Sequence, residues 1–281
     1  MLSFFQPPFF EPFFYPLFFF FGLAVGSFLN CLIYRLEKNE ALFWGRSYCP
    51  NCRYVLSWQD LIPLFSFFLL KGKCRYCRQK ISWQYPLVEI STAAIFLLIF
   101  NFFTPLDNFV SNGARFSIFN FLNLIYYWLI ASFLIVIFVY DLKHYIIPDR
   151  IIYSAIGIAL IFNFQFLIFN QFSIFKFSIL SGLGAAIFFL TIVLISGGKW
   201  MGIGDIKLAF LMGLILGWPN ILVALFLAFL LGAFIGAILL ISRKKTLKSE
   251  IPFGPFLVSG TFISIFFGPQ IISFYLNLFL I

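Results

Sequence analysis

The chain has 281 residues, of which 62% are hydrophobic and only 10% charged, and its formal net charge is +9. A soluble domain carries about a quarter charged residues, so this composition excludes an ordinary soluble globular protein. Apolar runs of roughly 20 residues recur along the chain, and a helix of that length can cross a bilayer. The composition therefore predicts an all-α protein that crosses a membrane several times.

We expect eight membrane-spanning helices. Their approximate bounds are 13–33, 86–104, 119–140, 151–169, 178–196, 206–217, 221–241 and 256–279. The sixth span is short because Gly217-Trp218-Pro219-Asn220 ends it. The expected domains are a first transmembrane helix, a cytosolic loop domain and a seven-helix bundle, at 1–34, 35–85 and 86–281.

Lysines and arginines are distributed unevenly between the two predicted sides of the membrane. Only Arg115 and Lys176 fall on one side. The other seventeen lie in or beside the loops at 35–84, 141–150, 197–207 and 242–250. Cytoplasmic loops of membrane proteins carry the excess of Lys and Arg, so we expect the basic loops in the cytosol and both termini outside. The positive charge is therefore explained by the orientation of the protein in the membrane, and a nucleic-acid partner is not expected.

The 35–84 loop contains four of the five cysteines, arranged as Cys49-Pro-Asn-Cys52 and Cys74-Arg-Tyr-Cys77 with 21 residues between the pairs. Structural disulfides are rare in a reducing compartment, and four thiolates at this spacing suit a tetrahedral structural Zn²⁺ site. The loop is too small to build much apolar core, so a bound metal would help it fold. A redox or disulfide role is the alternative. Cys31 lies within the first span and is expected to pack there.

Two aspartates stand at the predicted cytosolic ends of spans. Asp141 follows the apolar run 134–140, and Asp205 follows Gly202-Ile-Gly204 at the entry to the sixth span. A carboxylate near the hydrocarbon costs a few kcal/mol, and such residues usually face a bundle interior and mark function. The alternative is a pair of boundary aspartates solvated by water at the headgroups.

The predicted topology puts Asp141 and Asp205 at the same membrane level on the same side. Gly202 and Gly204 lack side chains, so the backbone there can approach a neighbouring helix closely. Two adjacent carboxyls do not easily both ionise: one keeps a proton while the other acts as a base. Such a pair can activate water against a peptide carbonyl and protonate the leaving amine. The pattern therefore predicts an intramembrane aspartyl peptidase.

Other readings of the acidic residues stay open. Asp149, after Pro148, competes with Asp141, although its position suits the N-cap of a helix. A secondary transporter could use Asp141 and Asp205 as ion sites. Transporter sites typically lie near the midplane, however, and the sequence has no evident inverted repeat. A membrane scaffold anchored through its zinc domain is a third possibility. The lone His144 is expected to be an ordinary loop residue.

Several motifs in one order resemble those of the bacterial prepilin peptidases, also called type IV leader peptidases, within the G-x-G-D aspartyl proteases. The resemblance extends from about residue 22 to residue 260. It is carried by the two C-x-x-C pairs together with Gly26–Leu36, Trp58–Leu64, Tyr85–Glu89, Asp141 with Ile147-Pro148-Asp149, Gly202–Asp205 and Pro252–Phe256.

The resemblance implies that Asp141 and Asp205 are the catalytic pair. It implies cleavage of the leader from type IV prepilins and type II secretion pseudopilins at the cytosolic face of the bacterial inner membrane. It also implies N-methylation of the new N-terminus with S-adenosylmethionine, a function associated with the segment from the first span through Glu89. Glu89 either positions the methyl donor or the substrate amine, or pairs with a nearby Arg or Lys. The Pro252–Phe256 loop either holds the substrate strand or is a plain turn.

The sequence departs from the family pattern at three positions. The family commonly has Gly after the second Cys of each pair, where this chain has Arg53 and Arg78. Glycine would ease the tight turn at a metal knuckle. Leu61 stands where the family often has Asn.

Overall fold

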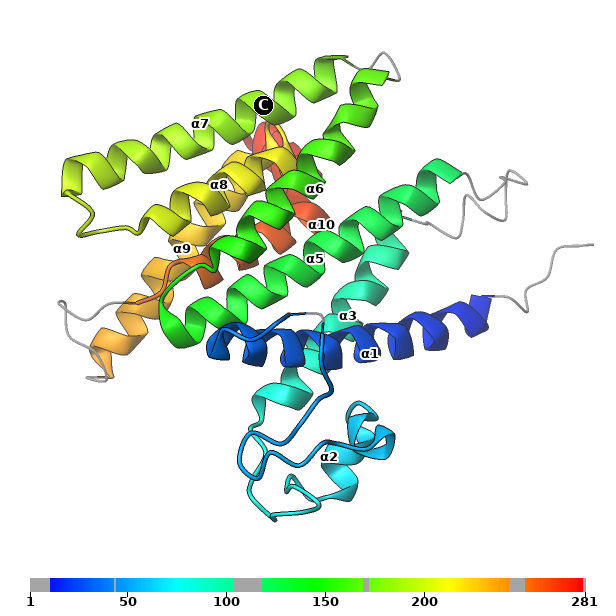
Figure 1. Ribbon diagram of the computed structural model, residues 1–281. Coiled ribbons are helices and arrows are strands. Elements are labelled where there is room, and N and C mark those ends of the chain that lie inside the picture. Colours follow the sequence, from blue (N-terminus) through cyan, green and yellow to red (C-terminus); the bar gives the residue numbers. More distant parts are fainter. Residues whose placement is uncertain (1–10, 43, 104–117, 169–171, 243–250, 280–281) are drawn as a thin grey trace, which may run out of the picture. The chain divides into compact units, whose positions relative to one another are not determined.

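The structure is a computed structural model that describes residues 11–42, 44–103, 118–168, 172–242 and 251–279. Within these ranges the only β structure is two isolated bridges, Tyr48 with Val55 and Lys73 with Lys80, so the predicted all-α class is confirmed. The elements are α1 (Glu11–Lys38), η1 (Trp58–Leu61), α2 (Phe65–Leu69), α3 (Gln84–Phe103), α5 (Ile118–His144), α6 (Asp149–Ile168), α7 (Phe172–Ser196), α8 (Ile203–Leu216), α9 (Asn220–Ile241) and α10 (Gly254–Phe279) (Figure 1).

Six of the described helices are long and apolar enough to cross a membrane: α1, α3, α5, α7, α9 and α10. The chain is therefore a multi-pass membrane protein. Helices α6 and α8 coincide with the fourth and sixth predicted spans, but α8 has 14 residues, fewer than the roughly 20 that a crossing requires. The count of eight spans stays a prediction. Arg115, Arg243, Lys244, Lys245 and Lys248, which support the predicted orientation, lie outside the described residues.

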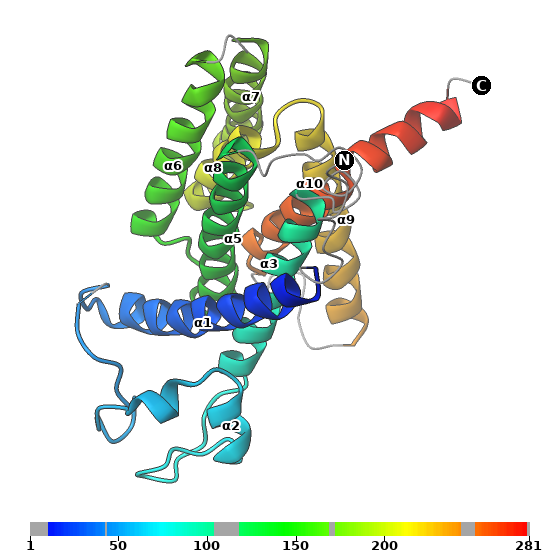
Figure 2. The same ribbon diagram turned by 90° about the vertical axis from the view of Figure 1, so that its right-hand side faces the viewer.

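The chain forms two compact units, Met1–Val136 and Ile137–Ile281, which divide within α5. In the first unit, α1 packs against α3 through small residues. A Cβ atom on Gly22 would lie 2.6 Å from the Cα of Ala93, and one on Gly26 would lie 2.7 Å from the Cα of Glu89. Such close backbone approach is typical of helix pairs in membranes. The 39–83 segment, which contains α2, connects these two helices (Figure 2).

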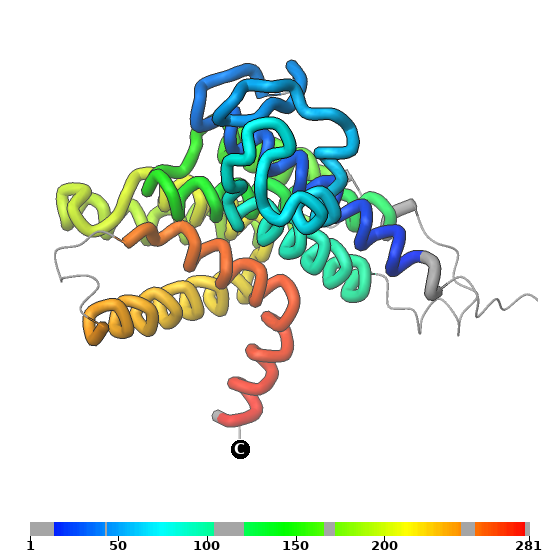
Figure 3. Tube along the Cα trace, turned by 90° about the horizontal axis from the view of Figure 1, so that it is seen from below, coloured from blue at the N-terminus to red at the C-terminus, as the bar shows by residue number. Residues whose placement is uncertain are grey.

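The second unit is built around α8. Its side chains Leu208, Leu211 and Met212 are fully buried, which is expected for a helix that is apolar on every face. Gly213 of α8 meets Gly182 of α7 at a crossing where a Cβ atom on Gly213 would collide with the backbone. Helices α9 and α10 lie side by side, and α10 bends partway along its length (Figure 3). The bend is expected from Pro269, because an internal proline removes a backbone hydrogen bond.

Candidate active site and metal centre

Asp141 lies in the last turn of α5, and its side chain is buried, with 4% of the residue exposed. Its Oδ2 accepts a hydrogen bond of 3.0 Å from the backbone N–H of Gly254, the first residue of α10. The first backbone N–H groups of a helix have no partner within it, and the helix dipole favours a negative charge there. Gly254 cannot carry a side chain in this arrangement, because its Cβ atom would lie 2.5 Å from Oδ2 of Asp141.

Asp205 lies in the first turn of α8 and is 8% exposed. Its Oδ2 accepts a hydrogen bond of 3.2 Å from the N–H of Gly202, the residue that caps the helix. Carboxylate-to-backbone pairing of this kind is half of a capping box, and here it fixes the side chain against its own helix end. Asp141 and Asp205 are therefore held in the same way, each by a glycine N–H at a helix N-terminus.

The two carboxylates belong to the same compact unit and interact electrostatically. The start of α8 contacts the loop that follows α5. A Cβ atom on Gly204 would lie 3.1 Å from the Cβ of Ile147, so the glycine permits a close approach. Ile147 itself is 6% exposed. The glycines of the Gly202-Ile-Gly204-Asp205 motif thus serve two purposes, since one holds the carboxylate and the other admits the neighbouring loop.

Asp149, in contrast to Asp141 and Asp205, is exposed and bonded to a lysine. It is the first residue of α6, its side chain is 65% exposed, and its Oδ1 accepts a bond of 2.6 Å from Nζ of Lys207. Lys207 also lies over the ring of Tyr153, with Nζ 4.8 Å from the centroid. The helix starts beside Asp149 as expected, but the N-cap position belongs to Pro148, whose carbonyl accepts a bond of 3.1 Å from the N–H of Ile152. The carboxylate of Asp149 forms an ion pair at the surface instead. His144 closes α5, with its ring 4.5 Å from that of Tyr140.

The four cysteines of the loop come together as the sequence predicts. The sulfur atoms of Cys49, Cys52, Cys74 and Cys77 all lie within 4.8 Å of one another, and those of Cys49 and Cys77 are 3.9 Å apart. Sulfur atoms around a tetrahedral Zn²⁺ with bonds of about 2.3 Å are separated by about 3.8 Å. The arrangement therefore fits a zinc ion that all four residues would hold.

The environments of these thiols differ. The backbone at Gln79 and the side-chain amide of Asn51 hydrogen-bond Cys77 and lower the pKa of its thiol to about 6. Burial raises the pKa of Cys74. Because a metal binds the thiolate form, Cys77 is available as a ligand at neutral pH, and a bound cation would favour the thiolate of Cys74.

The second cysteine of each pair is followed by a residue with left-handed backbone geometry. Arg53 has φ of 55° and Arg78 has φ of 61°. In both turns the N–H of this arginine donates to the carbonyl of the first cysteine, over 2.9 Å to Cys49 and 3.0 Å to Cys74. A non-glycine residue pays about 1–2 kcal/mol for this conformation. Two of the three departures from the family pattern thus fall on positions where the backbone favours glycine.

Asp60 links the loop before α2 to the second cysteine pair, a role that its position in the sequence did not indicate. It accepts bonds of 2.8 Å from both Arg75 Nε and Ser57 Oγ, and one of 3.2 Å from the hydroxyl of Tyr76. Burial opposes the charge of Asp60, but the bonds from Ser57 and Arg75 outweigh it and hold the pKa of this carboxyl below its usual range. Arg75 and Tyr76 lie between the two cysteines, so Asp60 fixes that turn.

Glu89 of α3 is 6% exposed and binds the loop domain instead of a basic side chain. Its Oε2 accepts a bond of 2.8 Å from the N–H of Leu64, which has φ of 60°, and Ser27 of α1 donates a second bond. The predicted pairing with Arg or Lys is not observed among the described residues. Glu89 therefore fastens the start of α2 to the helix pair.

Arg35 and Asn30 of α1 are buried polar residues that sequence reasoning did not single out. Arg35 donates bonds of 3.0 and 2.7 Å to the carbonyls of Leu42 and Gly45, and Asn30 donates one of 3.0 Å to the carbonyl of Tyr85. These bonds satisfy backbone carbonyls at both ends of the loop domain. Their only sequence signal is a polar residue within an apolar helix.

The fold and the two sites define a class of protein: a multi-pass helical membrane protein with a buried carboxylate pair at helix ends and a Cys₄ loop domain. Two family models match this chain. Residues 20–103 match the bacterial peptidase A24 N-terminal domain, and residues 128–237 match the type IV leader peptidase family. No solved structure matches the chain.

Similar curated proteins cover nearly the whole chain. A prepilin leader peptidase/N-methyltransferase of Bacillus subtilis is 34% identical over 263 residues, which are 92% of this chain and 97% of that protein. Proteins of the same name from Legionella pneumophila and Pseudomonas aeruginosa are 33% and 30% identical, with 92% and 91% of each chain covered. The chain belongs to the type IV leader peptidase family.

Proposed function

We propose that this protein removes the leader peptide from type IV prepilins and type II secretion pseudopilins, with Asp141 and Asp205 as the catalytic pair. The observation that carries the proposal is the shared arrangement of these carboxylates, buried in one unit and each bonded to a glycine N–H at a helix N-terminus. Family membership and the names of the relatives support the same reaction.

The proposed chemistry is general acid–base hydrolysis of a peptide bond. One carboxylate of the pair takes a proton from water, whose oxygen attacks the scissile carbonyl, while the protonated partner donates to the carbonyl oxygen. Collapse of the tetrahedral intermediate breaks the C–N bond, the proton taken from water passes to the leaving amine, and one hydroxyl of the intermediate returns its proton to the second carboxylate. The glycine N–H groups keep both side chains oriented, which reduces reorganisation during the reaction. The step requires no nucleophilic side chain.

We place this reaction at the cytosolic face of the bacterial inner membrane. The support is the concentration of Lys and Arg in the loops that adjoin Asp141 and Asp205. The apolar helix of the substrate would enter from the lipid, while its leader stays in the cytosol. A membrane helix has no free backbone groups, so the substrate must unwind at the scissile bond.

We also propose that the enzyme methylates the new N-terminus with S-adenosylmethionine, as the names of its relatives indicate for those proteins. Zinc would tie the two cysteine turns of the loop domain together without taking part in cleavage. Glu89, the buried carboxylate of this unit, is already bonded to Leu64 and Ser27, so we assign no residue to the methyl donor.

The test is co-expression with a prepilin, followed by mass spectrometry of the pilin N-terminus. The expected product lacks the leader and carries the added mass of one methyl group. A prepilin that keeps its leader would contradict the peptidase assignment. A processed pilin without the added mass would contradict only the methyltransferase assignment.

A further inference from the structure

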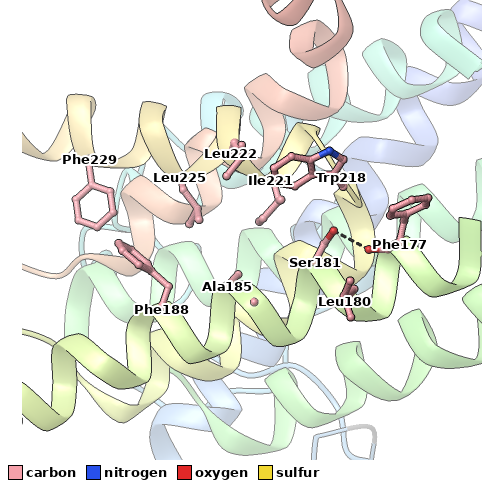
Figure 4. A pocket seen from close by; sticks show the side chains of 11 residues that line it. Phe177, Leu180, Ser181, Ala185, Phe188, Trp218, Ile221, Leu222, Leu225 and Phe229 are labelled. Carbon is pink, nitrogen blue, oxygen red and sulfur yellow. Dashed lines mark hydrogen bonds between the residues drawn. The ribbon is translucent and has the colours of Figure 1, made fainter.

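A groove between α7 and α9 has a volume of about 660 Å³ (Figure 4). Its wall on α7 includes Leu180 and Phe188, and its wall on α9 includes Leu222 and Phe229. The lining is almost wholly apolar. Two polar groups lie along it: the hydroxyl of Ser181, which donates a bond of 2.6 Å to the carbonyl of Phe177 within α7, and the indole N–H of Trp218. The groove therefore offers a polar ligand very few partners.

The floor of the groove on α7 is made of small residues. Ser181, Gly184 and Ala185 line it, and a Cβ atom on Gly184 would meet nothing within 4 Å. Small side chains three or four residues apart on one face of a helix allow a second membrane helix to approach closely. The neighbouring face of α7 uses the same device, because Gly182 packs against Gly213 of α8. One face of α7 is thus occupied by a helix, and the face beside it is shaped to receive one.

The groove leads to the carboxylate pair through a chain of aromatic contacts. Phe188 and Phe229 lie with ring centroids 6.3 Å apart, and Phe229 is 5.1 Å from Phe253. The residue after Phe253 is Gly254, whose N–H binds Asp141. From Phe177 to Phe188, α7 rises roughly 16 Å, about half the thickness of a hydrocarbon core. A helix in the groove would therefore lie within the membrane and end beside the proposed active site.

We infer that this groove binds the apolar transmembrane helix of the substrate, with the N-terminal end of that helix at Phe253 and its C-terminal end toward Trp218. The inference rests on the proposed function and adds the binding site for the part of the substrate that is not cleaved. A lipid acyl chain also fits the apolar lining. However, binding of a lipid chain would not explain the small residues on the floor of the groove or the contacts that connect the groove to Asp141.

The direct test is photo-crosslinking. Phe177, which is 50% exposed in the groove, is replaced by p-benzoylphenylalanine, and Phe234, which is 65% exposed on α9 outside the groove, is the matched control. Both carry Asp205→Asn to prevent cleavage and are reconstituted with a full-length prepilin in vesicles of phosphatidylethanolamine and phosphatidylglycerol. Crosslinks to prepilin from position 177 and not from 234 are expected. Lipid adducts alone at position 177 would overturn the inference.

The second test fills the groove. Gly184→Leu puts a large side chain on its floor and should lower the cleavage efficiency for a membrane-embedded prepilin about tenfold, mainly through a higher KM. Gly236→Leu is the matched control, because a Cβ atom there also meets nothing within 4 Å and the residue does not line the groove. Equal cleavage by both variants would overturn the inference while leaving the peptidase assignment intact. A wild-type enzyme that fails to cleave would overturn both.

Discussion

The Cys₄ domain and the carboxylate pair reach their geometry by different means. The four sulfur atoms come from two short turns, whose shape is fixed by hydrogen bonds within each turn. Asp141 and Asp205 come from helices far apart in the chain, and glycines let those helices and loops approach closely. Local turns can be held by a metal, whereas the carboxylates depend on the packing of a whole unit. Each part should therefore fail separately when its own residues are changed.

The largest expected effect is on cleavage, and it follows from changing the two carboxylates. Asp141→Asn and Asp205→Asn should each reduce prepilin cleavage by about 10²–10⁴-fold, because an amide is neither a base nor an acid in this reaction. The zinc content should stay unchanged in both variants. Asp149→Asn is the control, since that exposed carboxylate pairs with Lys207, and it should cleave normally. Normal cleavage by either variant of the pair would refute the assignment of that residue.

The next largest effect concerns the metal. Cys49→Ser and Cys74→Ser should each lose bound zinc, because three thiolates hold the ion much less tightly than four. Limited proteolysis should then cut the 39–83 segment faster, while the rate of cutting in the Ile137–Ile281 unit, which contains Asp141 and Asp205, should not change. Cys31→Ser is the control, because its sulfur contacts Ser47 and lies outside the cluster. Full zinc content, measured by metal analysis of the denatured Cys49→Ser and Cys74→Ser proteins, would rule out the four-cysteine site.

A smaller effect is expected where the loop domain is fastened to α3. Glu89→Gln keeps the shape of the side chain but weakens its bond to the N–H of Leu64, which is worth about 1.5–3 kcal/mol when the acceptor is charged. Hydrogen exchange of the amides at 62–69 should accelerate several-fold, with zinc retained. Glu37→Gln on α1 tests whether loss of any nearby charge has this effect. Unchanged exchange in the Glu89 variant would show that this bond does not hold the domain.

The sequence predicted the features that depend on the spacing of nearby residues and on the length of apolar runs. The two C-x-x-C pairs indicated a metal site, and apolar runs predicted the long helices. Asp141 and Asp205 could be paired because both stand at predicted inner ends of spans. Their hydrogen bonds could not be predicted, because the bond from Gly254 to Asp141 depends on where α10 begins in space. For the same reason the sequence did not indicate that Asp60 and Glu89 hold parts of the loop domain in place. Their partners are a side chain and a backbone group distant in the chain, Arg75 for Asp60 and Leu64 for Glu89.

The smallest effect tests whether the cysteine turns carry backbone strain. Arg53→Gly and Arg78→Gly should each stabilise the zinc-bound loop domain by about 0.5–1 kcal/mol, because glycine avoids the left-handed penalty but loses more entropy on folding. The gain would be measured as slower zinc release to a chelator. Lys80→Gly is the control, since its backbone pairs with Lys73 in extended geometry, and glycine there should destabilise. Faster release from both arginine variants would mean that the arginine side chains contribute more than the strain costs.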